Sequence, residues 1–214
     1  MKARMLLYSL AVLTLALAPA LAMAQQMTFT ALRNSSATFK TDAPLETVVG
    51  TTAGGAVSGT VTGDPARPQA ATGTIRIDLT TLKTGIEKRD ADMRSKQYLD
   101  TDNEANRHAV FELKGVEMGG PLEPGKDSLA RLKGILTIKQ KPVEISATAR
   151  ITYVKLTPEQ LETQKRFGFT SENIRVKANF TTSFTNHGMQ IPELMFFKLS
   201  NDIQIETELT FVRQ

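Results

Sequence analysis

The residues best suited to chemistry stand together in one charged stretch near the middle of the chain. Arg89-Asp90 opens a charged group that runs to Arg94, and acidic side chains recur from Asp100 to Glu104. Clustered carboxylates are the groups that coordinate calcium or move protons, and an arginine recognises anionic groups. We therefore tested each of these chemistries against the residues and their spacing.

The run from Asp100 to Glu104 begins like a calcium-binding loop. The sixth position of such a loop is Ala105 here rather than Gly, and the twelfth is Phe111 rather than Glu. Both residues are needed, one for a sharp turn and the other for bidentate coordination. A solvated loop with turn-forming Asx residues is the better interpretation.

Other catalytic and metal-binding patterns lack support. The two histidines, His108 and His187, are far apart with no third imidazole, so a zinc site would need carboxylates or water to complete it. Ser58 and Ser183 lack the Gly-x-Ser-x-Gly context of a hydrolase nucleophile. The chain has no cysteine, which excludes disulfides, thiolate catalysis and cysteine-based metal sites. We expect a binding protein rather than an enzyme, with no catalytic residue, metal or cofactor.

The first 24 residues resemble a secretory signal peptide. Two basic residues precede an uncharged apolar run that closes on small residues at Ala22 and Ala24, the pattern that a signal peptidase reads. We predict cleavage after Ala24, with cuts after Ala20 or Ala22 left open, and a periplasmic or secreted bacterial protein. Residues 25–214 then form a single domain without a stable membrane anchor, since no later apolar run is long enough to span a bilayer.

Charge gives little indication of a macromolecular partner. Removing the leader leaves 24 basic residues against 22 acidic ones, so the formal net charge falls from +4 to +2. The charges are interspersed rather than clustered, which argues against a nucleic-acid surface. We expect no nucleic-acid partner, and leave open whether the protein is a homodimer.

Alternation of apolar and polar residues dominates the rest of the chain. Every second residue from Val143 to Tyr153 is apolar, and the segment from Ile203 to Phe211 repeats this pattern except at Thr207. One face of each strand is then dry and the other wet, as is typical of antiparallel sheets. The strands predicted in this way lie at 29–39, with a turn at 33–36, and at 73–79, 108–116, 130–138, 143–153, 174–184 and 203–212, while glycines at 48–63 predict a bend or hairpin.

About eight such strands form either a sandwich or a closed barrel, and closure is favoured because it removes free edges. We predict an all-β fold, an antiparallel barrel of about eight strands with one or two short helices. A capping box at Thr157 predicts a helix over 158–165. A second helix is expected at 90–98, with Asp90 as its cap and Arg89 paired with a nearby carboxylate. Residues 195–197, Met-Phe-Phe, are interpreted as a core-facing strand rather than a lid.

An ordered set of motifs begins at Gly73. A Gly-initiated strand is followed by Thr81-Leu82-Lys83-Thr84-Gly85, Arg89-Asp90, Leu99-Asp100 and an aromatic strand at Phe111, and later by Gly134-Ile135-Leu136-Thr137-Ile138 and Lys141-Pro142-Val143. In their order and spacing these motifs resemble the polyisoprenoid-binding YceI-like family. The resemblance implies a lipocalin-like barrel in an exported bacterial protein, with a long internal cavity that holds an isoprenoid or fatty chain.

Alternation alone leaves open whether the interior is packed or hollow, and the resemblance favours a hollow one. We expect the barrel to hold a long-chain amphiphile, namely an isoprenoid quinone, a polyprenyl or a fatty amphiphile, for transport or storage. The alternatives are an enzyme acting on a lipid inside the barrel and a stress-response interaction module with a filled core. Arg89 is the candidate for contact with a polar head group. The candidate lipid-binding residues that line the cavity are Phe39, Ile75, Ile77, Phe111, Leu136, Ile145, Ala147, Phe180, Phe184 and Ile205.

Overall fold

The computed structural model describes residues 26–194 and 196–214. The predicted signal peptide and its cleavage site lie outside the described residues. The described chain is mostly β-strand, with two short helices, α1 (Glu87–Arg94) and α2 (Pro158–Gln164). No helix in this part of the chain is long and apolar enough to cross a bilayer.

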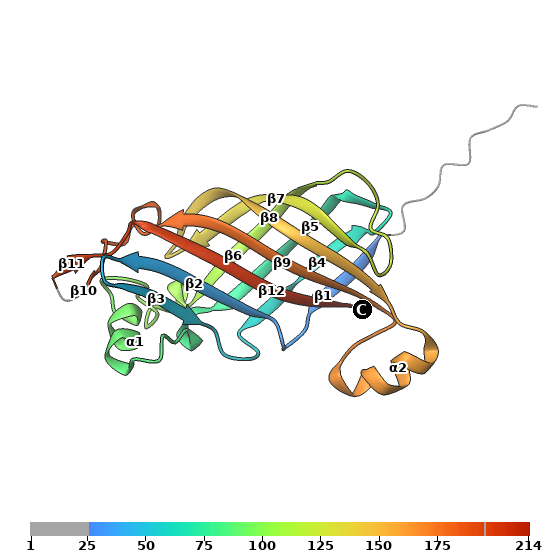
Figure 1. The fold of residues 1–214 in the computed structure, drawn as a ribbon, viewed down its shortest axis with the longest axis horizontal. Coiled ribbons are helices and arrows are strands. Elements are labelled where there is room, and N and C mark those ends of the chain that lie inside the picture. Colours follow the sequence, from blue (N-terminus) through green and yellow to red (C-terminus); the bar gives the residue numbers. More distant parts are fainter. Residues whose placement is uncertain (1–25, 195) are drawn as a thin grey trace, which may run out of the picture.

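Eight antiparallel strands of the described chain close into a barrel, which confirms the predicted fold class (Figure 1). β12 pairs with β9 on one side and with β1 on the other, and this second pairing closes the circle. Around the wall the order is β1 (Met27–Ala31), β4 (Val57–Asp64), β5 (Arg67–Asp78), β6 (His108–Glu117), β7 (Asp127–Ile138), β8 (Lys141–Lys155), β9 (Glu172–Ser183) and β12 (Asp202–Arg213).

Two further strands extend the wall at one end. β2 (Ser36–Ala43) follows β1 after a turn and pairs with residues 204–208 of β12, while β3 (Glu46–Thr51) pairs with β2. β1 takes residues 211–213 of the same long strand. The predicted strand at 29–39 is thus two strands around the expected turn, and the Gly-rich stretch is β3 and β4.

The two ends of the barrel carry different connections (Figure 1). At the α1 end, η1 (Leu79–Thr81), α1 and η2 (Glu104–Asn106) join β5 to β6. The link from β9 to β12 lies at the same end and contains η4 (Thr185–His187) and a small hairpin of β10 (Glu193–Leu194) and β11 (Phe197–Lys198). At the α2 end, α2 and η3 (Lys165–Phe167) join β8 to β9.

The two helices differ in how well the sequence predicts them. α2 has the expected capping box, in which the Thr157 hydroxyl accepts a hydrogen bond from the Gln160 amide and the Gln160 side chain accepts one from the Thr157 amide. α1 begins at Glu87 rather than at residue 90, and it ends at Arg94. Its early end follows from a turn in which the Ser95 amide bonds to the Asp92 carbonyl.

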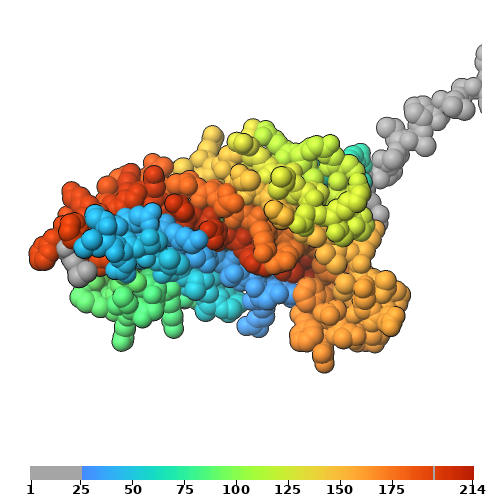
Figure 2. All heavy atoms as spheres, viewed as in Figure 1, coloured from blue at the N-terminus to red at the C-terminus, as the bar shows by residue number. Residues whose placement is uncertain are grey.

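The interpretation of residues 195–197 as a core-facing strand is wrong. Met195 lies outside the described residues, but Phe196 is fully exposed and Phe197 is 42% exposed. In the described chain β10 and β11 pair only with each other, so this hairpin is not part of the barrel wall. Figure 2 shows the hairpin projecting at the left beyond β2, β3 and α1.

A buried polar cluster closes the α2 end of the barrel. The Tyr153 hydroxyl donates to Glu172 Oε1 at 2.8 Å, and the same carboxylate accepts from Arg213 and, at 3.3 Å, from Lys155. Tyr153 is 3% and Glu172 is 8% exposed. Burial and then the bond to Glu172 raise the pKa of Tyr153, which keeps its hydroxyl protonated as a donor. Paired in this way, the charges are tolerated at the base of an apolar interior.

Replacing Glu172 by Gln removes a buried charge that serves three donors. We expect Glu172→Gln to lower the free energy of unfolding by about 2–3 kcal/mol, because the partner cation stays partly buried without its carboxylate. The matched control is Glu208→Gln, which breaks the exposed pairs with Arg175 and Lys177 and should cost less than about 1 kcal/mol. Urea unfolding of both variants measures the difference, and equal losses would contradict the proposed closure.

Candidate binding site in the barrel lumen

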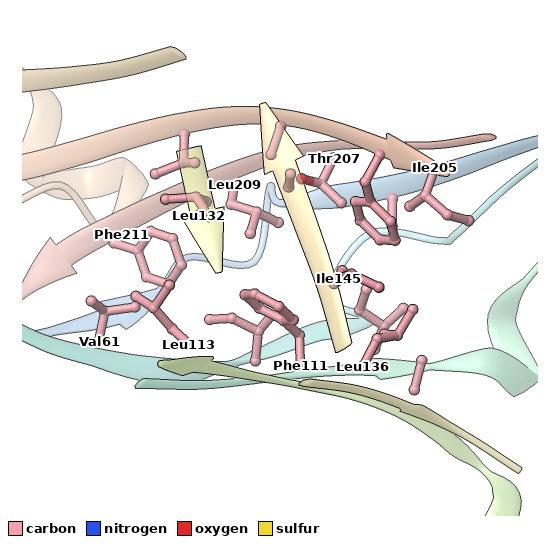
Figure 3. A pocket seen from close by; sticks show the side chains of 18 of the residues that line it. Val61, Phe111, Leu113, Leu132, Leu136, Ile145, Ile205, Thr207, Leu209 and Phe211 are labelled. Atoms are coloured by element: carbon pink, nitrogen blue, oxygen red, sulfur yellow. The ribbon is translucent and has the colours of Figure 1, made fainter. Parts of the chain in front are cut away.

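The inward faces of the wall strands enclose an apolar cavity, here called the lumen, of about 190 Å³. It runs through the barrel from Leu82 at the α1 end to Leu122 at the α2 end. Figure 3 shows Val61, Leu113 and Phe111 on one side of it and Leu209, Thr207 and Ile205 on the other.

The lining permits only a narrow range of chemistry. In the described chain it contains no ionisable side chain, and only Thr38, Thr52 and Thr207 carry a polar group. For comparison, an engineered cavity of about 150 Å³ lined by apolar side chains stays dry and takes up benzene. The lumen can therefore hold a slender apolar guest and offers no acid, base or metal ligand for a reaction.

Nine of the ten predicted lining residues lie on the wall of the lumen. The exception is Phe184, which packs in the apolar cluster at the α1 end without lining the cavity. β9 ends at Ser183, and Phe184 already has helical backbone angles at the start of η4. The strand alternation that predicted an inward side chain at Phe184 therefore ends one residue before it, at Ser183. The nine that line the lumen are Phe39, Ile75, Ile77, Phe111, Leu136, Ile145, Ala147, Phe180 and Ile205.

Sequence reasoning missed other lining residues, for two different reasons. Leu82 and Leu122 come from connections between strands, where no periodicity indicates direction. Val176 and Leu209, in contrast, continue the alternation of strands that were predicted. The same pattern that identified Phe180 and Ile205 would have found them.

Two phenylalanine rings lie directly against glycines of neighbouring strands. The Phe39 ring on β2 covers Gly50 on β3, and the Phe111 ring on β6 covers Gly134 on β7, so closely that a Cβ atom on either glycine would overlap the ring. Because these positions have no side chain, the rings can lie close to the wall. Together with the small side chain of Ala147 on β8, the glycines leave room inside a barrel that its own side chains would otherwise fill.

Arg89 is held outside the lumen. Its Nη1 atom lies 2.7 Å from Glu46 Oε1 and its Nε donates to the Thr84 hydroxyl at 2.9 Å. The predicted pairing with a carboxylate is confirmed, and the partner is at the start of β3. Arg89 is not among the residues that line the cavity, and its contact with a head group stays a prediction.

The prediction that Asp90 caps α1 is wrong. The N-cap residue is Ile86, and Asp90 lies one turn inside the helix. Its Oδ1 accepts from the Thr84 amide at 2.7 Å and from the Thr84 hydroxyl at 2.6 Å. Burial by itself raises the pKa of Asp90, but the Thr84 bonds, helped by Arg94 and Arg89, outweigh it and lower that pKa. Asp90 thus fixes the loop before the helix onto the helix.

The acidic run that follows is a structural loop. Asp100 accepts a hydrogen bond from the Asn106 side chain at 2.9 Å, and the Asn103 side chain caps η2 by accepting from the Ala105 amide at 3.1 Å. This confirms the predicted loop with turn-forming Asx residues. Nowhere in the described chain do three His, Asp or Glu side chains converge as metal ligands.

His187 is fully buried at the α1 end. Its Nδ1 lies 3.2 Å from the Lys141 carbonyl and its Nε2 lies 2.8 Å from the Thr182 hydroxyl. A neutral ring that donates from Nδ1 and accepts at Nε2 satisfies both contacts. Burial lowers the pKa of His187. The ring therefore ties η4 to the first residue of β8 as an uncharged group.

Comparisons with known proteins find the same barrel fold in other proteins. Residues 28–211 match the family model described as the YceI-like domain. Three solved structures share the fold. One is a polyisoprenoid-binding domain from Saccharophagus degradans implicated in plant cell wall breakdown, with 14% identity and a TM-score of 0.63 over 89% of this chain and 100% of that one. The second is BcnA from Burkholderia cenocepacia, with 15% identity and a TM-score of 0.58 over 82% of this chain and 95% of that one. The third is a YceI protein from Campylobacter jejuni, with 18% identity and a TM-score of 0.58 over 78% of this chain and 85% of that one. None of the curated protein sequences matches.

The buried imidazole predicts a pH dependence of stability. Histidine in an unfolded chain has a pKa of about 6.5. Because the pKa of His187 is lowered in the folded protein, the unfolded chain binds more protons than the folded one as the pH falls below that value. The contribution of the neutral His187 ring to the free energy of unfolding is then fully present above about pH 6.5, and it is lost as the pH falls toward the lowered pKa. We expect Tm to fall between pH 7 and pH 5, and to fall less in His187→Asn. A wild-type slope in His187→Asn would contradict the assignment.

Proposed function

Because the chain belongs to the YceI-like domain family, we propose that it binds one long apolar chain in the lumen and is not an enzyme. The observation that carries this proposal is the lumen itself, which crosses the barrel and is apolar apart from three threonines. A relative with the same fold is described as a polyisoprenoid-binding domain. Isoprenoid quinones, polyprenyls and fatty amphiphiles all supply a tail that suits such a lining.

Burial of the tail supplies the affinity. Each CH₂ group removed from water contributes about 0.8 kcal/mol, so a chain of about twelve carbons gains roughly 10 kcal/mol before the cost of association is subtracted. Without charged partners in the lining, this gain depends on length and thickness rather than on polar groups. We expect the protein to accept several tails of similar width.

The proposed role is transport or storage of the amphiphile by an exported protein, periplasmic or secreted. An enzyme acting on a lipid in the same barrel would need a titratable group beside the guest, whereas the nearest polar atoms in the described lining are threonine hydroxyls. A stress-response interaction module would need a filled core, which is at odds with a cavity of about 190 Å³. Native mass spectrometry of protein purified from its own host, followed by organic extraction, tests the proposal. A lumen found without any hydrophobic ligand would contradict it.

Filling the lumen should weaken binding strongly without unfolding the protein. Ala147 lines the lumen, and Ser146 beside it on β8 is exposed on the outer face. We expect Ala147→Phe to weaken binding of cis-parinaric acid, a fluorescent C18 fatty acid, at least about 30-fold, since the ring occupies the space of several CH₂ groups. Ser146→Phe is the matched control. Fluorescence titration and Tm are measured for both, and unchanged affinity in a folded Ala147→Phe variant would overturn the proposed site.

Thr207 should reduce affinity for purely apolar tails. Its hydroxyl lies on the wall about halfway along β12 (Figure 3), where a saturated chain covers it without offering a hydrogen bond. Covering an unpaired hydroxyl costs about 1–3 kcal/mol, so the isosteric Thr207→Val variant should bind hexadecanoic acid about ten-fold more tightly. Calorimetry measures the change, with Thr210→Val, a half-buried position on the outer face of β12, as control. Weaker binding by Thr207→Val would show that the hydroxyl contacts the guest favourably.

A further inference from the structure

Both ends of the lumen are covered by buried side chains. At the α1 end, Leu99, Met189 and Ile203 lie beyond the lining residues and are at most 8% exposed. At the α2 end, Tyr153 and Glu172 form the buried polar cluster. A guest that enters along the barrel axis must displace one of these clusters.

The side wall has one weak seam, between β3 and the segment that follows β5. β3 pairs with β2 through six residues, but its other edge meets the described chain in a single bridge, between Thr51 and Lys83. Two backbone hydrogen bonds form this bridge, each 2.9 Å from nitrogen to oxygen. The shortest ladder in the closed barrel, between β1 and β12, has three paired residues. The seam is therefore the part of the wall with the fewest bonds to break.

The lumen lies directly behind the seam. Phe39, Thr52 and Leu82 border it and line the cavity, and Gly50 on β3 adds no side chain between them. On the outside, the large apolar side chains of Val49 on β3 and Ile86 across the seam are 42% and 51% exposed. An apolar guest would therefore meet apolar side chains on both sides of this wall.

An ion pair crosses the seam. Glu46 begins β3, and Arg89 belongs to α1, so their contact at 2.7 Å joins the two sides. Thr84 and the helix hold Arg89 in place. Figures 1 and 2 show β2 and β3 beside α1 at this end of the molecule.

The chain after β3 can also bend. Residues 52–56 contain Gly54 and Gly55, and Gly55 has φ of +83°, a conformation that suits glycine. The Gly55 amide bonds to the Arg33 carbonyl in the turn between β1 and β2 at 2.8 Å. The two turns at the base of the β2–β3 ribbon thus lie side by side, where a hinge would be needed.

We propose that the guest enters and leaves the lumen sideways through this seam, and that the Arg89–Glu46 ion pair latches it. The proposal rests on the proposed function, because it assigns an entrance to the same lumen. It predicts that movement of β3 away from Lys83, rather than opening of either end, limits exchange of the guest.

A disulfide across the seam tests the proposal. The Thr51–Lys83 bridge carries both reciprocal hydrogen bonds, a geometry with Cα atoms about 5.5 Å apart that a disulfide can span. The chain has no cysteine of its own, so Thr51→Cys/Lys83→Cys forms one defined bond. With cis-parinaric acid displaced by excess oleic acid, we expect oxidation to slow release at least about ten-fold and reduction to restore it. The control disulfide is Arg150→Cys/Lys177→Cys between β8 and β9, which are paired and exposed.

The latch is tested by Glu46→Gln, which should speed release about three-fold, the size expected for a partly exposed pair. Glu206→Gln is the matched control, because it breaks the pair with Lys40 on the same ribbon without touching the seam. Release unaffected by the seam disulfide would overturn the proposed entrance and leave the proposed function standing.

Hydrogen exchange gives a measurement that needs no guest. The amides of Thr51 and Lys83 should exchange faster than those of the β8–β9 ladder, and faster still in Glu46→Gln. If no probe binds to any variant, the proposed function fails, and exchange alone decides whether the seam opens. Seam amides as protected as the β8–β9 amides would overturn the proposal.

Discussion

The pairing of β12 with β9 on one side and with β1 and β2 on the other is the constraint on which the rest of the structure depends. Through this pairing, the backbone N–H and C=O groups of the barrel wall find hydrogen-bond partners within the sheet. The pairing also removes the free edges of long alternating strands. It also sets the register. A slip of one residue in β12 would turn Glu206 and Glu208 into the lumen in place of Ile205 and Thr207, so the apolar face of this strand would point to solvent.

Closure by eight strands creates the second constraint, which is width. A barrel of this size is just wide enough for its own side chains to fill it or to hold one small ligand. Here the balance favours a cavity because Gly50 and Gly134 let two rings lie against the wall and because alanines such as Ala147 and Ala178 occupy inward positions. The same residues that keep the lumen open keep it narrow, so thickness is the property of a guest that it can select.

The two ends of the barrel combine stability and access in different ways. The α2 end is closed by charges that stabilise only when all of them are paired, as in the cluster around Glu172. The α1 end is covered by apolar loop residues and by the neutral ring of His187, and the β2–β3 ribbon is bonded firmly along one side only. Local opening is expected where bonded contacts are fewest, which places adjustable structure at the α1 end and fixed structure at the α2 end.

The sequence by itself determined the features that depend on neighbouring residues. Alternation predicted the strands and nine lining residues, because side chains of a strand point to opposite faces whatever lies beyond. The capping box predicted α2, because both of its bonds lie within four residues. Only the tertiary structure decided where the pattern ends at Phe184, that Asp90 reaches back to Thr84, and that Arg89 meets Glu46, 43 residues earlier. It also decided that the interior is hollow, because space inside a barrel depends on how side chains from distant strands meet across it.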